Sequence, residues 1–270
     1  MTLNNSEAGV VKKKAIRTRL KEWFKGVTGK SLLVTEKSLL EEELPDLFGY
    51  HILQLGALDE GNFLDSSRIS HRVLFDLAPQ DSFSPGKLVC HSSYIPIDAN
   101  SVDVVLLPHV LEFEDDPHEV LREVERILIG EGHLLIVGFN PLSLFGIWHV
   151  LLAWRGTSPW NGYFYRSARV RDWLRLLGFD VVKTRYFFFR PPVRTGWIMK
   201  RLGFLEKVGN YLWPWLGGSY LIIGKKRLIP LTPTKTEWRI RRRLIASGVT
   251  EPTTRAREIL KQVSNKKTAI

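Results

Sequence analysis

The chain has 270 residues and a formal net charge of +11, and its single cysteine, Cys90, excludes an intrachain disulfide and any cysteine-rich zinc site. The most apolar stretch, 142–154, is too short to span a bilayer. No secretory signal is visible near the N-terminus. We therefore expect a cytoplasmic protein that is at most peripheral to a membrane and that binds no metal.

Positive charge is concentrated at the two ends of the chain. From Lys225 onward thirteen Lys/Arg face three Glu, and segment 11–30 carries eight Lys/Arg against Glu22. Such tracts attract anionic partners, here nucleic acid or a membrane surface, although a solvated tail is an equally good interpretation. We expect residues 229–270 to form a basic tail, folded or disordered, that contacts such a partner.

Residues 15–45 have the apolar spacing of a helix, with Trp23, Leu32 and Leu40 on one stripe. They predict a basic, helical N-terminal extension over residues 1–47. After it the pattern changes to short apolar runs between turn residues, which indicate strands. These runs are 51–55, 72–76, 87–91, 102–107, 133–137, 180–188 and 219–223. Runs that are apolar throughout are typical of strands buried on both faces of a parallel sheet.

Two amphipathic helices are predicted between these strands. The first covers 117–129, with Asp116 as its N-cap and with Gly130 and Gly132 ending it. The second covers 167–177. Strands that alternate with helices predict an α/β fold with a doubly wound sheet.

In such a sheet a ligand binds beyond the carboxyl ends of the strands. Gly56 follows the first strand and permits a tight turn, and Asp76 ends the second strand twenty residues later. An acid at that position can accept hydrogen bonds from both ribose hydroxyls of an adenosine cofactor. A dinucleotide fingerprint needs further glycines, and Leu58 stands at the next expected glycine position. S-adenosylmethionine (SAM) has no phosphate and constrains the loop less.

Four segments resemble, in order and spacing, the type 11 family of class I SAM-dependent methyltransferases. They are 76–79, 90–97, 101–113 and 116–136. Downstream, 138–146 resembles an uncharacterised bacterial subgroup. The resemblance covers about residues 48–138 and implies a seven-stranded, mostly parallel, Rossmann-like sheet whose last two strands form a hairpin. It implies a methyltransferase domain over 48–228, in which 139–218 supply cap elements on the acceptor side.

The resemblance implies cofactor-binding positions near the carboxyl ends of the predicted strands. They are Gln54, Gly56 and Ala57 around the methionine part of SAM, Asp76 and Leu77 at the ribose and adenine, His91 and Ser92 at the adenine edge, and Leu107, Pro108 and His109 at the floor of the site. As a catalytic residue, His109 could orient the methyl acceptor or take its proton, and a buried histidine with a structural role is an equal alternative.

The sequence also departs from the family pattern. Gln54 replaces the acid of the first strand, two glycines are missing, and the turn-like segment 80–86 replaces a helix. We expect a SAM-dependent methyltransferase for a small apolar or aromatic acceptor, because the aromatic segments 139–164 and 195–218 could form a cap. Two alternatives stay open: a methyltransferase-like protein that binds without catalysis, and an RNA or protein methyltransferase guided by its basic ends.

Two further motifs receive structural interpretations. Asn140-Pro141 resembles the start of a motif of amino-group DNA methyltransferases but follows the fifth strand, so a turn or helix start is favoured. The acidic stretch 112–116 is interpreted as a solvated loop at a helix N-terminus rather than a cation site.

Overall fold

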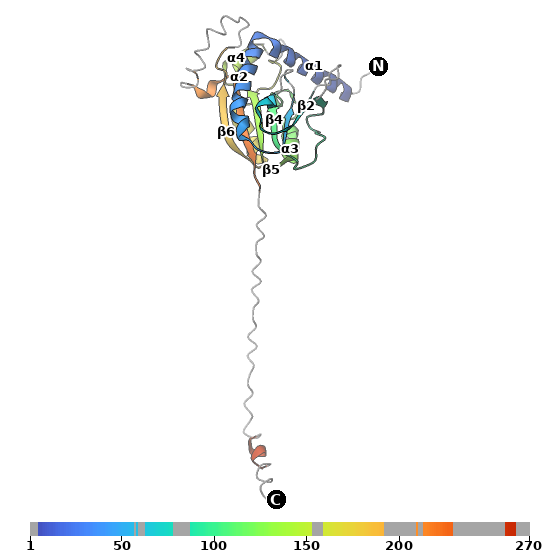
Figure 1. Ribbon diagram of the computed structural model, residues 1–270, viewed down its shortest axis with the longest axis vertical. Coiled ribbons are helices and arrows are strands. Elements are labelled where there is room, and N and C mark those ends of the chain that lie inside the picture. Colours follow the sequence, from blue (N-terminus) through green and yellow to red (C-terminus); the bar gives the residue numbers. More distant parts are fainter. Residues whose placement is uncertain are drawn as a thin grey trace. The chain divides into compact units, whose positions relative to one another are not determined.

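The computed structural model describes residues 5–56, 58, 63–77, 87–152, 159–191, 209, 213–228 and 257–262, with the backbone alone for 5–14, 87, 152 and 214. The chain divides into two units, Met1–Ile229 and Pro230–Ile270. In the second unit, residues 257–262 are helical, and the remainder of the predicted basic tail lies outside the described residues. The first unit holds the sheet and its helices (Figure 1).

The first unit is built on one seven-stranded sheet with the order β3-β2-β1-β4-β5-β7-β6. Its strands are β1 (His51–Leu55), β2 (His71–Asp76), β3 (Lys87–Val89), β4 (Val102–Pro108), β5 (Leu128–Phe139), β6 (Phe179–Phe187) and β7 (Ser219–Lys226). β7 is antiparallel to both of its neighbours, and the other pairs are parallel. This confirms the predicted doubly wound, mostly parallel sheet with a terminal hairpin.

Five helices and several short 3-10 turns are described in this unit. The helices are α1 (Asn5–Lys25), α2 (Val27–Glu43), α3 (Pro117–Ile127), α4 (Leu144–Leu152) and α5 (Ser167–Leu176), and the turns are η1 (Leu44–Asp46), η2 (Phe63–Ser66), η3 (Leu111–Phe113) and η5 (Pro214–Leu216). The helix predicted over 15–45 is two helices that part at Gly26. A side chain at Gly29 would lie 2.4 Å from Phe24 Cα, so this glycine lets α2 turn back closely against α1.

The two faces of the sheet support two separate cores. Leu20 and Phe24 of α1 and Leu40 of α2 share one core cluster with Ile52 of β1. The neighbouring Leu53 belongs to the other cluster, with side chains of α3 and α5. Successive strand residues point to opposite faces, so every central strand is covered on both sides. Each fully buried aliphatic or aromatic side chain contributes about 1.5–3 kcal/mol to folding.

Helix α3 begins as predicted and ends earlier. The Asp116 carboxylate accepts hydrogen bonds from the amides of His118 and Glu119 at 2.8 and 3.2 Å, which confirms it as the N-cap. The predicted end at Gly130 and Gly132 is wrong. Leu128 is already extended and pairs with Val102, so both glycines lie within β5.

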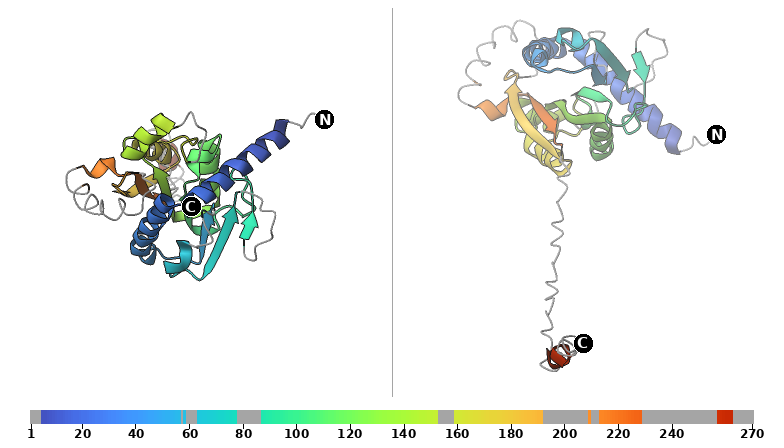
Figure 2. Two further views of the ribbon diagram at one scale, coloured as in Figure 1. Left: turned by 90° about the horizontal axis from the view of Figure 1, so that it is seen from above. Right: turned by 60° about the horizontal axis from the view of Figure 1, so that its bottom comes forward.

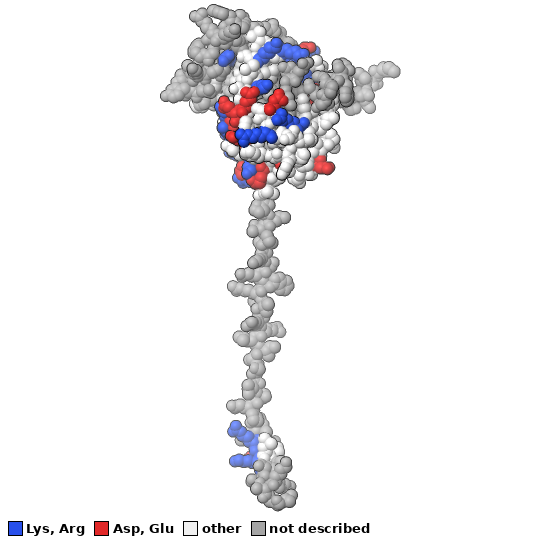
Figure 3. Space-filling view, viewed as in Figure 1, with Lys and Arg blue, Asp and Glu red and all other residues white. Residues whose placement is uncertain are grey.

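Ion pairs connect α2 to the edge strand β6. Lys183 Nζ lies 2.7 Å from Glu43 Oε1, and Arg185 lies 2.8 Å from the same oxygen and 2.7 Å from Glu42 Oε2. Figure 3 shows acidic and basic side chains together on the viewed face of the first unit. Lys183, Arg185 and Glu42 are partly exposed while Glu43 is buried, so these pairs add to the packing of α2 against the sheet.

Candidate functional site

The turn after β1 brings several predicted site residues together. Gly56 has a φ of +94°, and its amide donates to Phe75 O at 2.7 Å. A methyl group added at Gly56 would lie 3.1 Å from Val110 Cγ2 and 3.8 Å from both Leu77 Cδ1 and Pro108 O. Gly56, Leu77 and Pro108 therefore converge at the carboxyl edge of the sheet. Only a residue without a side chain permits this approach at a positive φ.

Asp76 ends β2 at the same edge and is buried, with 2% of its surface exposed. Lys21 Nζ of α1 lies 2.5 Å from Asp76 Oδ2. The acid predicted to accept hydrogen bonds from ribose hydroxyls thus already accepts one from a cation of the same chain. α1 crosses the unit at this edge (Figure 2), so a ligand that reaches Asp76 also meets α1.

Gln54, near the end of β1, has a side-chain oxygen that accepts no hydrogen bond from the described residues. Its Nε2 donates to Gly56 O at 3.1 Å. Its Oε1 is buried and, among the described residues, has no hydrogen-bond partner. A buried acceptor without a partner costs about 1–3 kcal/mol. The amino group of the methionine part of SAM is a donor that fits it. Ala57, predicted for the same part of SAM, lies outside the described residues.

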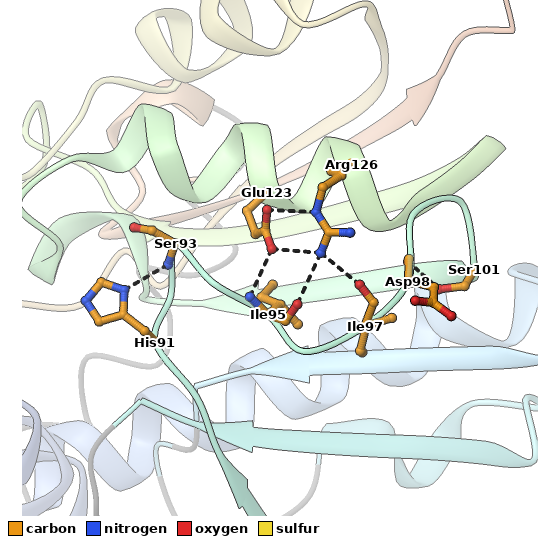
Figure 4. A network of polar contacts seen from close by, with 8 residues as sticks. All are labelled: His91, Ser93, Ile95, Ile97, Asp98, Ser101, Glu123 and Arg126. Atoms are coloured by element: carbon orange, nitrogen blue, oxygen red, sulfur yellow. Dashed lines mark hydrogen bonds and ion pairs between the residues drawn. The ribbon is translucent and has the colours of Figure 1, made fainter.

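The segment after β3 is anchored by α3 (Figure 4). Glu123 accepts from the Ile95 amide at 2.9 Å, and Arg126 donates to the Ile95 carbonyl at 3.1 Å. Of the two predicted adenine-edge residues, Ser92 is buried and His91 is exposed. Because β3 runs parallel to β2, this segment follows the strand that neighbours Asp76.

His109, just after β4, is fully buried between two carboxylates. Its Nε2 lies 2.8 Å from Glu36 Oε1, and its Nδ1 lies 3.2 Å from Glu112 Oε1. The ring packs at a tilt against Phe139, with centroids 4.1 Å apart. The backbone φ of +48° is unusual for a residue with a side chain and is held by these contacts. Leu107, predicted beside it, lies in the core cluster on the α3 face.

The charges around His109 decide its protonation. Burial lowers its pKa, but the charges of Glu36 and Glu112 outweigh burial and raise the pKa to about 9. The pKa of Glu36 is also raised, by burial above all. His109 is therefore an imidazolium at neutral pH, with both nitrogens engaged. This geometry suits the structural alternative, and a catalytic role for His109 stays a prediction.

Arg17 of α1 joins the same group. It donates to the carbonyls of His109 and Val110 at 3.1 and 3.2 Å and to Glu114 Oε1 at 2.9 Å. Glu112 and Glu114 are buried, so the expectation of a solvated acidic stretch is wrong for these two residues. Arg17 and Lys21 of the basic N-terminal segment thus bind acids of their own chain.

Sequence reasoning missed Arg17, Lys21 and Glu36 as parts of this site. Arg17 and Lys21 are four residues apart, about one helical turn. The apolar residues Leu20 and Phe24 have the same spacing. That spacing shows that the two cations share a helix face. It does not show that the face turns toward acids some 50 to 100 residues away.

Phe139 and Phe145 of the predicted aromatic cap are packed core, whereas Trp148 and Tyr163 are exposed. Phe139 stacks on Phe164 at 5.0 Å and on Phe145 at 5.9 Å between ring centroids. Trp23 of α1 meets Phe139 edge-on at 6.1 Å. Most of the second cap segment, 195–218, lies outside the described residues.

Comparison with known proteins gives relatives that cover most of the chain. The family described as "Methyltransferase domain" matches residues 69–136. YafS, an uncharacterised protein of Escherichia coli K12, is 36% identical over 186 residues, which are 69% of this chain and 72% of YafS. Rv2003c, an uncharacterised protein of Mycobacterium tuberculosis, is 30% identical over 181 residues, which are 63% of this chain and 60% of Rv2003c. The chain thus spans less than two thirds of the mycobacterial relative.

Solved structures share the fold. A SAM-dependent methyltransferase of Thermotoga maritima superposes with a TM-score of 0.51 at 19% identity, over 70% of this chain and 89% of its own. One from Archaeoglobus fulgidus gives 0.51 at 18% identity, over 71% and 93%. At these identities the likeness shows the fold alone.

Proposed function

Because this chain belongs to the class I SAM-dependent methyltransferases, we propose that it binds SAM at the carboxyl ends of β1, β2 and β4 and transfers the methyl group to a small apolar or aromatic acceptor. The observation that carries the cofactor proposal is the buried Asp76 carboxylate beside the Gly56 turn. The unpartnered Oε1 of Gln54 at the same edge supports it. The acceptor proposal rests on the aromatic segments 139–164 and 195–218.

When bound, SAM supplies a methyl group that its sulfonium already activates. The protein therefore needs to position the reactants and exclude water. In this proposal Asp76 accepts from the ribose hydroxyls, Gln54 Oε1 accepts from the amino group, and Gly56 lets the backbone come close. His109 and Glu112 fix the loop after β4, which forms the floor of the site.

Lys21 sets a condition on this binding. Its ammonium occupies one oxygen of Asp76, so the ribose must displace it or share the carboxylate with it. The same contact is the specific support for the second candidate, a methyltransferase-like protein whose Asp76 serves only to hold α1. The third candidate, an RNA or protein methyltransferase, rests on the basic sequence of residues 229–270.

Calorimetric titration with SAM tests the cofactor proposal. We expect wild-type protein to bind in the micromolar range and Asp76→Asn to bind at least about tenfold more weakly, because a hydrogen bond to a charged group is worth about 1.5–3 kcal/mol. Asp172→Asn, at an exposed position on α5, is the matched control and should bind as the wild type does. Folded wild-type protein that releases no heat up to millimolar SAM would leave the second candidate in place. Equal binding of SAM by Asp76→Asn and wild type would show that the SAM site does not include the end of β2.

A further inference from the structure

Helix α4 places an apolar stripe on the outside of the first unit. Leu144, Ile147 and Leu151 are three and four residues apart and are 43%, 58% and 55% exposed. The opposite side of the helix is anchored, because Phe145 is fully buried and His149 Nε2 bonds to Gly162 O at 2.9 Å. α4 carries no Lys, Arg, Asp or Glu, so its outer side has no charge.

A second segment, distant in sequence, continues this apolar stripe. The Asn140 side chain donates to the carbonyls of Trp215 and Gly217 at 2.8 and 2.9 Å. Its own Oδ1 accepts from the Leu142 amide at 3.1 Å, which confirms the predicted turn at Asn140-Pro141. One buried asparagine therefore joins the start of α4 to η5. Trp213 and Trp215 are 52% and 56% exposed.

Between the two segments lies a hollow of about 320 Å³. Apart from Ser143 and Gly209, its lining is hydrophobic: Leu142, Leu144, Ile147, Phe189, Trp213 and Leu216. We call Leu142, Leu144, Ile147, Leu151, Trp213 and Leu216 the α4 surface. Contiguous exposed apolar area of this kind marks an interaction site.

The chemistry around the α4 surface favours a lipid bilayer as the partner. Tryptophan beside aliphatic side chains is the composition preferred at the boundary of headgroups and acyl chains. The sequence 190–212 joins Phe189 to Trp213, both of which line the hollow, and it contains five Lys/Arg against Glu206 alone. Most of 190–212 lies outside the described residues, but its composition, with Lys and Arg beside apolar and tryptophan residues in the sequence, favours an anionic membrane surface.

The dimensions fit binding in the membrane interface. Among the described residues, no helix is long and apolar enough to cross a bilayer, and α4 has nine residues. Because the inner side of α4 is fixed to the protein, only its outer, uncharged side is available to enter the acyl boundary. We propose that the α4 surface docks this protein on an anionic lipid bilayer. The proposal is independent of whether SAM binds.

Co-sedimentation with vesicles tests this docking. The full chain should bind vesicles of phosphatidylethanolamine and phosphatidylglycerol and bind those of phosphatidylcholine much less. Ile147→Glu should reduce binding to the anionic vesicles by about tenfold or more, because it places a carboxylate in the buried stripe. Leu176→Glu is the matched control. Leu176 is 84% exposed at the end of α5, on the other face of the sheet, and binding should change less than about twofold.

Both variants keep the basic tail, so a difference between them reports the α4 surface. Thermal unfolding of both confirms that they fold. Absence of wild-type binding to anionic vesicles overturns the proposal, and so does equal binding of the two variants. A third result would also overturn it. Light scattering without vesicles measures the oligomeric state. If the wild type is a dimer and Ile147→Glu is a monomer, the α4 surface joins two copies of this chain.

Discussion

Two polar groups lie near α1 and differ in how firmly they are held. At the end of β2, Asp76 pairs with Lys21, and their side chains are 3% and 17% exposed. After β4, His109 is enclosed by Glu36 and Glu112, and all three are at most 2% exposed. In the first group the Lys21 side chain is partly exposed to solvent, whereas Asp76 is buried. The second joins α2, the loop after β4 and, through the Phe139 amide on Glu112, the end of β5.

This difference separates a replaceable contact from a permanent one. An ion pair that water reaches contributes little, so a ligand with equivalent donors can replace it. Breaking a buried charge group leaves an uncompensated charge in the interior. The Asp76 end can therefore serve binding, while the His109 end keeps the floor of the site in place.

The largest effect is expected from His109→Gln. This change leaves two buried carboxylates without their cation and should lower the free energy of unfolding by about 3–5 kcal/mol, measured by urea denaturation. Glu36→Gln removes the partner on α2 and should also destabilise the protein strongly. Glu41→Gln, at an exposed position on the same helix, is the control and should stay within about 0.5 kcal/mol of wild type. If the His109 variant were as stable as the Glu41 control, the His109 group would not be the firmly held one.

A smaller effect is expected from pH. The pKa of His109 is raised from 6.5 to about 9, so the native state holds this proton more tightly than the unfolded chain. The resulting stabilisation is complete below about pH 6.5 and is lost as the pH rises through about 9, a change of about 3 kcal/mol. The raised pKa of Glu36 acts in the same direction. Urea denaturation from pH 6 to pH 9.5 should show this fall in wild type and a flatter profile in His109→Gln. Parallel profiles would contradict it.

The smallest effect is expected at Lys21. If the ribose competes with its ammonium for Asp76, Lys21→Met should tighten SAM binding by about threefold, since a partly exposed ion pair is worth about 0–1 kcal/mol. Lys25→Met, exposed one turn further along α1, should leave the affinity unchanged. Weaker binding by Lys21→Met alone would mean that Lys21 holds the ligand rather than competing with it. Calorimetry distinguishes these results.

Local sequence patterns predict most helices and strands correctly. The errors lie where contacts with neighbouring elements determine an end or a break. β4 and β5 were predicted because each contains an uninterrupted apolar run, 104–107 and 134–137, and the N-cap at Asp116 fixed the start of α3. The end of α3 was misplaced because pairing of Leu128 with Val102, and not the glycines, starts β5. The break at Gly26 was missed because apolar spacing continues through it.

The candidate site was predicted in part. Gly56, Leu77 and Pro108 converge because each follows or ends a strand at one edge, which the strand pattern already implies. The partners of Asp76 and His109 come from α1 and α2, and their approach depends on how those helices lie on the sheet. No spacing in the sequence encodes that approach.

The position of β7 between β5 and β6 bears on the order of folding. During synthesis, β5 is complete at Phe139, but its partner strand is not made until Lys226. Until then β5 and β6 both present unpaired backbone at the edge of a growing sheet, which is where nascent chains aggregate. Pairing over such sequence separation is slow. The last strand of the first unit therefore determines when β5 loses its free edge and β6 joins the sheet.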